Sequence, residues 1–252
     1  MSTSPTERYL ALVTAHLNKL QEEEHAAVLL AARLVAEQVK ADRIVYAYGP
    51  GGHSNLGAQE IFFRAGGLMH VSAILDEGTL LSGGALRSMA IERTSGYAAV
   101  VLEDYGIGEG DLLILINAYG INAAVIDAAM EAKRRGASVI AVTSSAHARE
   151  TPPDHPARHP SKRNLHELAD VVLDCKIGVG DAVLELDGLE QKVGAMSTFA
   201  NAFLLNALVA ETVAMLSAEG VRPPIWMSGN ATGGDAWNRR HMAQIKGRVK
   251  KL

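Results

Sequence analysis

The sequence predicts an α/β protein, a three-layer sandwich in which helices cover both faces of a doubly wound, five-stranded parallel sheet. Strand, turn and helix follow one another in units that begin at Ile44, Asp111 and Ser138. The run from Leu112 to Ile116 is apolar at every position, which is typical of a parallel strand covered on both faces. These two observations together indicate the fold class.

The first forty residues are expected to form a helical segment outside this alternating core. Apolar residues recur at helical spacing over Tyr9–Val39, and Ser4 or Thr6 can cap the start of the helix. The polar run Gln21–His25 indicates either a break between two helices or a solvated stretch of one. A helix of this length outside the core often packs on a partner subunit.

Two strands are expected in the first part of the core, over residues 44–48 and 68–75. A helix starting at Ser54 should join them and stop at Gly66-Gly67, because paired glycines favour helix ends. On this helix we expect Ala58, Ile61, Phe62 and Ala65 to face the sheet. A glycine-rich loop over 76–84 and a helix over 85–93 should follow, and residues 97–104 fit either strand or helix.

The second part of the core is expected to hold three more strands, over residues 111–116, 138–142 and 169–174, with a helix over 123–135. The four prolines within residues 146–164 predict an irregular loop. Residues 178–194 read as a loop or short hairpin, and Ser197–Ala218 as a long apolar helix. We expect three parts: a helical segment (1–40), a ligand-binding α/β domain (41–218) and a tail (219–252) that ends in a basic helix.

Bulk composition excludes several classes of protein. The 252 residues are 48% hydrophobic and carry a net charge of −4, so the chain can bury a sizeable core and lacks the basic excess of nucleic-acid binders. No apolar run reaches the length of about 18 residues needed to span a membrane, and residues 1–7 do not resemble a secretory signal. The single cysteine, Cys175, excludes an intrachain disulfide. These features fit a reducing cytoplasm.

The turn after the first strand, Gly49-Pro50-Gly51-Gly52-His53-Ser54, is the feature around which the site is built. In open α/β folds ligands bind at the carboxyl ends of the strands. The helix that follows points unpaired backbone N–H groups at this turn, so the turn favours a phosphate or another anion.

Two further strand ends carry hydroxyl and amide groups, and parallel strands bring all three ends to one edge of the sheet. Together they predict a crevice with many neutral donors, which suits a phosphate. The alternative is that these residue types simply belong in tight turns and helix caps. The candidate binding residues are Gly51, Gly52, Ser54, Asn117, Tyr119, Asn122, Thr143, Ser144 and Ser145.

The segments Ile44–Gly66, Asp111–Ser145 and Ala169–Asp174 resemble the sugar isomerase (SIS) domain, a phosphosugar-binding α/β fold, and the resemblance covers most of residues 40–218. The stretch 187–194 and the tail 224–252, with Ser228-Gly229-Asn230 and Gly234-Asp235, are similar to a bacterial branch of SIS proteins often likened to phosphoheptose isomerases. The resemblance implies the strand order 2-1-3-4-5. SIS domains occur in aldose–ketose isomerases, in sugar-phosphate lyases and in regulators that only sense phosphosugars.

The second turn departs from the usual SIS pattern. That turn commonly reads Ser-x-Ser-Gly, with the serines holding the phosphate, whereas here the positions are Asn117 and Tyr119. Both side chains can still donate a hydrogen bond, so we expect a phosphate pocket that is shifted, smaller or adapted to another anion. Ser54 and the run Thr143-Ser144-Ser145 do fit the pattern.

Aldose–ketose isomerisation needs a base that moves a proton between neighbouring carbons and a proton carrier at the sugar oxygens. Glu60 is the candidate base, because SIS isomerases tend to carry a glutamate on this helix; the alternative is a surface pair with Arg64 at i,i+4. His53 can open the sugar ring or carry a proton, or it is a turn residue bonded to backbone. Glu190 is a second acid–base candidate, or a solvated loop carboxylate.

We therefore expect a sugar-phosphate isomerase that needs no cofactor. The histidines of the proline-rich loop, at 147, 155 and 159, do not have the spacing of a metal site. The alternatives are a phosphosugar-binding regulator without catalysis and a sugar-phosphate lyase. We expect a homodimer or homotetramer formed by the N-terminal helix and Ser197–Ala218, with the tail near Asn230 and Asp235 reaching a partner's site, and no nucleic-acid or membrane partner.

Overall fold

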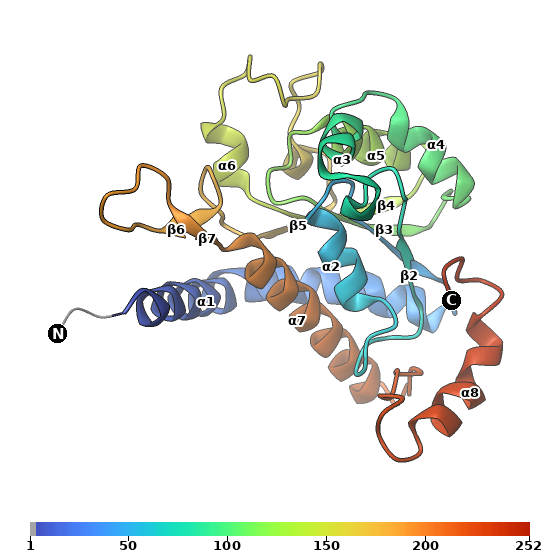
Figure 1. Cartoon of the computed structure of the whole chain (residues 1–252). Helices are drawn as coiled ribbons and strands as arrows, with labels where there is room; N and C mark the ends of the chain where they lie inside the picture. The colour runs from blue at the N-terminus through green and yellow to red at the C-terminus, as the bar shows by residue number, and fades with distance from the viewer. Residues whose placement is uncertain (1–3) are drawn as a thin grey trace.

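The computed structural model describes residues 4–252 and shows a central parallel sheet between two layers of helices (Figure 1). The five strands of the sheet run in the order β2-β1-β3-β4-β5, which confirms the predicted fold class and order. The strands are β1 (Val45–Tyr48), β2 (Val71–Ile74), β3 (Leu112–Ile116), β4 (Ser138–Thr143) and β5 (Val171–Asp174), and a separate antiparallel hairpin holds β6 (Ala182–Leu184) and β7 (Val193–Ala195).

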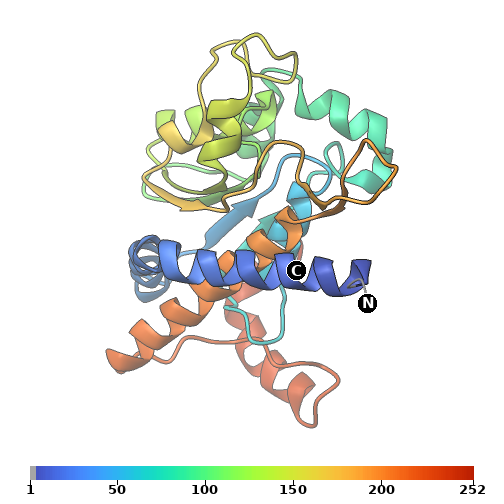
Figure 2. The ribbon, with the colours of Figure 1, turned by 90° about the vertical axis from the view of Figure 1, so that its left-hand side faces the viewer.

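The helices lie in two layers, which Figure 2 shows on either side of the sheet. Those covering one face are α1 (Pro5–Lys40), α2 (Ser54–Ile61) and α7 (Ser197–Ala218); those on the other side are α3 (Ala85–Glu92), α4 (Tyr97–Asp104), α5 (Ala123–Arg134) and the short α6 (Ser145–Glu150). The helix α8 (Gly234–Ile245) lies in the tail.

A hydrophobic core lies on each face of the sheet, and a strand contributes side chains to both cores because successive side chains point to opposite faces. In β3, Leu112 and Ile114 pack in the core beneath α1 and α7, whereas Leu113 and Leu115 pack against α4 and α5. All five residues of β3 are buried. The central position of this strand explains why its sequence is apolar at every position rather than alternating.

The helix α1 continues without a break through the polar run that the sequence left ambiguous. Glu24, in that run, is buried; one of its carboxylate oxygens accepts a hydrogen bond from the backbone N–H of Asp174 (2.9 Å), and the other pairs with Lys176 (2.7 Å). The run is therefore a stretch of one helix that is exposed except at Glu24, which joins the helix to the end of β5.

The helix α2 is shorter than predicted, and the expected helix over residues 62–65 is wrong. The backbone of Phe62 is extended, and its partly buried side chain packs against two hydrophobic cores. The backbone of Phe63 is left-handed, with φ of 49°. The Phe63 ring lies edge-on to Trp226, with centroids 4.6 Å apart, and the N–H of Gly66 donates to the carbonyl of Trp226 (2.8 Å). These contacts with the tail accompany an end of the helix at Ile61, before the glycine pair Gly66-Gly67 at which the sequence predicted it to stop.

The structure settles one segment that the sequence left ambiguous and adds a short helix to a second one that was expected to be a loop. Residues 97–104, which fitted strand or helix, form α4. The loop expected over 146–164 begins with the helix α6, whose start is capped by the Ser144 side chain, which accepts a hydrogen bond from the His147 N–H. The prolines that follow α6 prevent the helix from continuing.

The tail packs on the α/β domain. Trp226, Ile245 and Val249 form a small core with Ile44 and Met69, and Leu68 pairs with Ile225 in an isolated antiparallel bridge. The helix α8 lies at the end of the molecule away from α3 and α6 (Figure 1).

Among the described helices, α7 is long and apolar enough to cross a membrane by length and composition. In this fold it packs against α1, which it crosses obliquely in Figures 1 and 2, and against α2. Its residues Leu204, Leu205 and Leu208 belong to the main core. This packing is that of a core helix.

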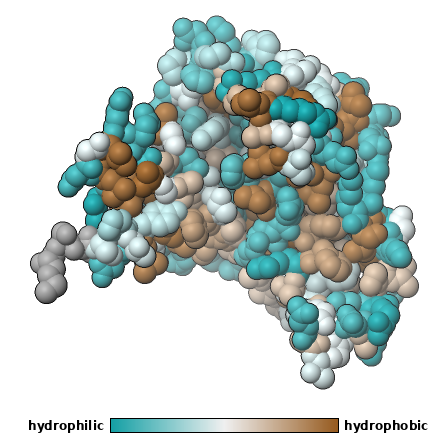
Figure 3. Space-filling model, in the orientation of Figure 1, coloured by the Kyte–Doolittle hydropathy of each residue, from teal (hydrophilic) through white to brown (hydrophobic). Residues whose placement is uncertain are grey.

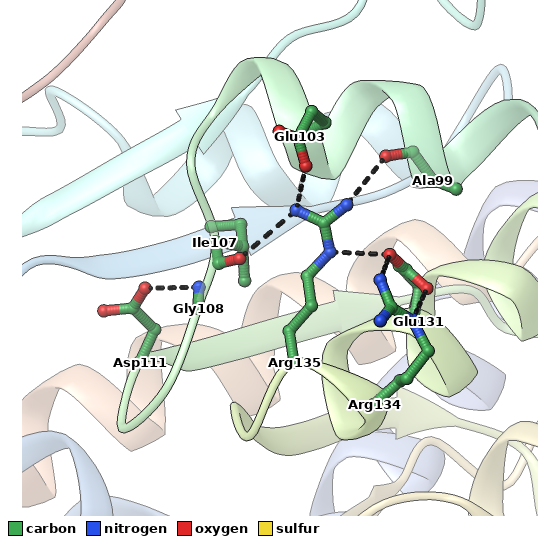
Figure 4. Close-up of polar contacts among 8 residues, drawn as sticks. All are labelled: Ala99, Glu103, Ile107, Gly108, Asp111, Glu131, Arg134 and Arg135. Atoms are coloured by element: carbon green, nitrogen blue, oxygen red, sulfur yellow. Dashed lines mark hydrogen bonds and ion pairs between the residues drawn. The ribbon is translucent and has the colours of Figure 1, made fainter.

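Arg135, just after α5, joins α5 to α4 (Figure 4). Its guanidinium contacts Glu131 (2.7 Å) and Glu103 (2.7 Å) and donates to the carbonyl of Ile107 (3.4 Å). Arg134 pairs with the same Glu131 carboxylate (2.6 Å). These ion pairs lower the pKa of Glu131 from its ordinary value of 4.5 to about 2, chiefly through the hydrogen bonds from Arg134.

Candidate functional site

The first and second turns meet in one cavity of about 390 Å³ at the carboxyl edge of the sheet. The start of α7 and the end of α3 close its other sides. The polar residues that line it are His53, Ser54, Ser88, Glu92, Asn117, Tyr119, Asp181, Ser197, Thr198 and Asn201, together with Gly52 and the apolar Leu81, Ala85, Met89, Ala118 and Ala195.

The first turn presents backbone donors to this cavity. Among residues 4–252, no acceptor pairs with the N–H groups of Gly52, His53 or Ser54, which lie at the start of α2 and line the cavity. The helix dipole adds partial positive charge at the same place. The turn is close-packed, because a Cβ on Gly51, whose φ is 145°, would lie 2.6 Å from Oε1 of Glu92. These features make the first turn the part of the cavity best suited to an anion.

In the second turn, by contrast, the side chain of Asn117 accepts hydrogen bonds from the backbone N–H groups of the turn itself. Oδ1 of Asn117 accepts from the N–H of Tyr119 (3.1 Å) and of Gly120 (2.8 Å). The Nδ2 group of Asn117 lies 3.3 Å from Oγ of Ser54, across the cavity floor, and 3.2 Å from Oε1 of Glu92. Asn117 therefore holds the two turns together and leaves fewer donors free at the second turn than at the first.

Tyr119 lies at the cavity wall, half-buried, with its ring stacked on His147 at a centroid distance of 4.2 Å. Burial raises the pKa of its hydroxyl, so the group stays protonated at neutral pH and can donate a hydrogen bond. The stacking on α6 holds this ring against the wall.

The cavity also contains Glu92, which sequence reasoning missed. This residue ends α3 and is half-buried between the first and second turns. Burial raises the pKa of its carboxyl, more than the hydrogen bond from Asn117 lowers it. No sequence signal indicates this position, because the direction of α3 depends on tertiary contacts such as the bond from Oγ of Ser88 to the carbonyl of Thr79 (2.7 Å).

Asp181 and Asn201 were missed as well. Asp181, before β6, caps α7: its carboxylate accepts from the N–H groups of Met196 (3.0 Å) and Ser197 (2.7 Å) and from Oγ of Ser197 (2.7 Å). Asn201, one turn into α7, is buried, and within the described residues its Oδ1 has no hydrogen-bond partner. An amide oxygen of this kind can accept a hydrogen bond from a ligand hydroxyl.

The third strand end supports the second turn and does not line the cavity. The Thr143 side chain packs against Gly120, and the N–H of Ser144 donates to the carbonyl of Ala118 (3.0 Å). Oγ of Ser144 donates to the carbonyl of Ile177 (2.7 Å), and Ser145 bonds the Asp174 carboxylate. The hydroxyls of Ser144 and Ser145 are thus bonded within the fold, and that of Thr143 is buried without a hydrogen-bond partner among the described residues. The expected three-sided crevice therefore has two of its turns at the cavity.

Asn122 likewise lies outside the cavity lining. It is buried at the start of α5, where its Nδ2 group donates to the carbonyl of Ala157 (3.3 Å). The structure therefore brings Gly52, Ser54, Asn117 and Tyr119 of the predicted binding residues to one cavity. Gly51 does not line it but packs against the carboxyl of Glu92, which does.

Glu60 lines an adjoining cavity of about 430 Å³ between α2 and α7. His53, Thr198 and Asn201 line both cavities. Oε1 of Glu60 lies 3.3 Å from Arg64 and accepts a hydrogen bond from Asn206 on α7 (3.1 Å). The surface pair with Arg64 thus exists, and the same carboxylate also faces a cavity that adjoins the first turn.

Glu190 is exposed in the loop between β6 and β7, and no cavity described here includes it. Apolar side chains gather over this hairpin in the space-filling view (Figure 3), and the exposed Val179, Leu189 and Val193 belong to the segment. Within this chain the hairpin lies beside the start of α7 (Figure 1).

Within the described part of the chain, the cavity at the two turns has no fixed cation in its lining. None of the described residues that line it is lysine or arginine, whereas Glu92 and Asp181 are both acidic. Among residues 4–252, no three His, Cys, Asp or Glu side chains form a group that could hold a metal ion. The arrangement can bind a ligand through neutral donors, and an anion can bind there only through N–H and O–H groups.

Comparison with known proteins agrees with the fold. A sequence profile of the SIS domain matches residues 8–144. The phosphoheptose isomerase of Neisseria gonorrhoeae has a similar structure, with a TM-score of 0.54 at 17% identity over 83% of this chain and 96% of that one. The phosphoheptose isomerase of Francisella tularensis gives 0.50 at 16% identity, over 85% of this chain and 100% of that one. These likenesses in structure concern the fold alone.

Fold, profile and strand-edge cavity together define a protein of the SIS domain class. Relatives are found over the whole length: the UPF0309 protein of Brucella canis is 40% identical over 246 residues, which is 98% of each chain, and that of Brucella anthropi is 39% identical over the same length. The chain therefore belongs to the UPF0309 family of SIS domain proteins.

Proposed function

We propose that this protein binds a sugar phosphate in the cavity between the two turns and isomerises it between aldose and ketose forms, as a phosphoheptose-isomerase-like enzyme. The observation that carries this proposal is the set of N–H groups at Gly52, His53 and Ser54, which have no acceptor among residues 4–252 and belong to the lining of a cavity large enough for a small ligand. The unpartnered Oδ1 of Asn201 supports it, because a sugar hydroxyl can donate to that oxygen.

In this proposal the phosphate binds at the first turn and the sugar extends along the start of α7. Ser54 and the start of α2 hold the phosphate. The sugar then reaches Asn201 and Thr198, which line both cavities. This orientation directs the carbonyl end of an open-chain sugar towards the cavity that contains Glu60.

Glu60 is the proposed base. An aldose–ketose isomerisation removes a proton from the carbon next to the carbonyl and returns it to the former carbonyl carbon, so one carboxylate can carry out both transfers. The Asn206 amide, bonded to Oε1 at 3.1 Å, fixes the carboxylate orientation. His53 is the proposed proton carrier at the sugar oxygens, and its exposed position in the lining of both cavities supports this role. A role for Glu190 requires that the hairpin moves or that a partner subunit uses it.

The test has two stages. Thermal-shift measurements against a panel of aldose and ketose phosphates should first show which compounds raise the melting temperature. NMR of each such compound in D₂O should then show deuterium entering the carbon next to the carbonyl, and Glu60→Gln should stop that exchange while the compound still binds. Full exchange in Glu60→Gln would remove Glu60 as the base.

A non-catalytic phosphosugar-binding protein is the second candidate. It is favoured by the contacts of Glu60, whose carboxylate is already paired with Arg64 and Asn206, and by Asn117, which occupies the donors of the second turn. Binding without deuterium exchange for every compound on the panel would support this function over the isomerase.

The proposal includes a homodimer or homotetramer in the cytoplasm. The side chains of Leu10 and Leu30 on α1 and of Phe199 on α7 are 64%, 53% and 44% exposed, and the N-terminal end of α1 extends beyond the sheet in Figure 1. A second copy would cover these side chains. Light scattering at micromolar concentration should give the mass of a dimer or tetramer, and a monomer there would contradict this assembly.

A further inference from the structure

An anion bound at the first turn would lie beside the carboxyl group of Glu92. Its Oε1 accepts a hydrogen bond from Asn117, whose same amide group bonds Ser54 (3.2 and 3.3 Å). The carboxyl also packs against the Cα of Gly51, where a Cβ would lie 2.6 Å from Oε1 and 3.1 Å from Oε2. Asn117 is the hydrogen-bond partner described for this carboxyl, and it contacts one of the two oxygens.

No lysine or arginine among the described residues of the cavity lining neutralises the negative charge of an ionised Glu92. The titratable groups that share its cavity are His53 from the start of α2, Tyr119 from the second turn and Asp181 from the segment before β6. Arg93, the next residue along, is exposed and does not line the cavity. Desolvation accordingly raises the pKa of Glu92 despite the influence of Arg93.

An ionised Glu92 would repel a phosphate bound at the first turn, and no lysine or arginine among the described residues of the cavity lining offsets this repulsion. A protonated carboxyl at the same place has the opposite effect, because it donates a strong O–H···O⁻ hydrogen bond to the anion. The anion in turn favours the protonated form of Glu92, since a neighbouring negative charge disfavours a second one.

We propose that Glu92 is a specificity-determining residue that binds the anionic group of the ligand as a neutral carboxylic acid, so that one proton enters the site with each anion bound. This inference rests on the proposed function, because it assumes an anion at the first turn. It assigns to Glu92 the role that a lysine or arginine has in many phosphate sites. The cost is that binding weakens as the proton concentration falls.

Sulfate and inorganic phosphate are suitable probes, because they require no knowledge of the sugar. Sulfate has no proton to lose near neutral pH, so any proton taken up with it comes to the protein. Isothermal titration calorimetry in buffers of different ionisation heats measures that uptake directly. Between pH 7 and 8.5 we expect the wild type to take up a measurable fraction of a proton, at most one, per sulfate, with Kd rising by up to about tenfold per pH unit.

Glu92→Gln is the informative variant, because its amide donates a hydrogen bond at every pH and nearly preserves the shape of the side chain. We expect it to bind both anions without proton uptake, and more tightly than the wild type at pH 8.5. His53→Gln should retain the uptake if Glu92 is its source. Glu150→Gln, at an exposed glutamate at the end of α6, is the matched control and should behave like the wild type.

The outcomes separate the two proposals. Sulfate and phosphate binding to the wild type without proton uptake, or with an uptake that Glu92→Gln leaves unchanged, would overturn the role of Glu92 and leave the sugar-phosphate site standing. Failure of both anions and of every sugar phosphate to bind wild type and Glu92→Gln, each shown to be folded by its melting curve, would overturn the proposed function together with this inference.

Discussion

The Nδ2 group of Asn117 donates to Oε1 of Glu92 over 3.2 Å, and this bond links the turn after β3 to the end of α3. Asn117 thereby connects three segments, since it also contacts Ser54 and the N–H groups of its own turn. The same residue that replaces the usual serine of SIS domains thus organises the floor of the cavity.

Asn117→Ala should destabilise the fold by about 1–3 kcal/mol, because it leaves the buried N–H group of Gly120 and its neighbour without their acceptor. Urea or thermal unfolding measures the change. Asn18→Ala, at an exposed asparagine on α1, is the control and should change the unfolding free energy by less than about 0.5 kcal/mol. Equal stability of both variants would contradict the structural role of Asn117.

Gly51→Ala should weaken both stability and anion binding. The added Cβ would meet the Glu92 carboxyl at 2.6 Å, and the φ of 145° is unfavourable for any residue with a Cβ. We expect a loss of about 1–3 kcal/mol in the free energy of unfolding. Gly178→Ala, in open space near the hairpin, serves as the comparison, and the prediction fails if the two variants melt together.

Asp181→Ala should shorten or fray the first turn of α7 and destabilise the fold by about 0.5–2 kcal/mol, because three donors lose their acceptor. Removal of one of the two carboxylates in the cavity lining should also strengthen the binding of inorganic phosphate. Chemical denaturation and calorimetry measure the two effects. Unchanged stability would show that α7 does not need this cap.

Glu131→Gln should lower stability at neutral pH but not in strong acid. Folding lowers the pKa of Glu131 from 4.5 to about 2, so the ionised carboxylate stabilises the fold above about pH 4.5, and the contribution is lost as the pH falls towards 2. We expect a difference of about 1–3 kcal/mol from the wild type at pH 7, smaller at pH 3. Denaturation at several pH values tests this, and a pH-independent difference would contradict it.

The sequence predicted the sheet well because the signal for a parallel strand is local. The apolar runs at 44–48 and 112–116 and the glycines that follow helices can be recognised without knowledge of the fold. The end of α2 could not be predicted in this way. Trp226, more than 150 residues further along the chain, holds Phe63 and Gly66 in place, and a local glycine signal gives no information about that contact.

The cavity was predicted in part for the same reason. The first and second turns follow strands directly, so their meeting follows from the order of the strands. Glu92 enters through the direction of α3, and Asp181 through a hairpin that brings it to a helix whose first residue is 16 positions away in the chain. The hydroxyls of Thr143 and Ser144 looked equivalent to that of Ser54, but the neighbouring segment after β5 takes up the Ser144 hydroxyl within the fold.

Because α1 packs on α7, which lies far later in the chain, this contact can form only late in protein synthesis. The hydroxyl of Tyr9 on α1 donates to the carbonyl of Ala195, which ends β7 just before α7 and lies 186 positions later in the chain. At ribosomal speeds of about 5–20 residues per second, the first helix has to wait roughly 10–40 seconds for its partner to be made. Through that interval its apolar stripe is uncovered, so the nascent chain should depend on chaperones that shield such surfaces until the last third of the protein has emerged.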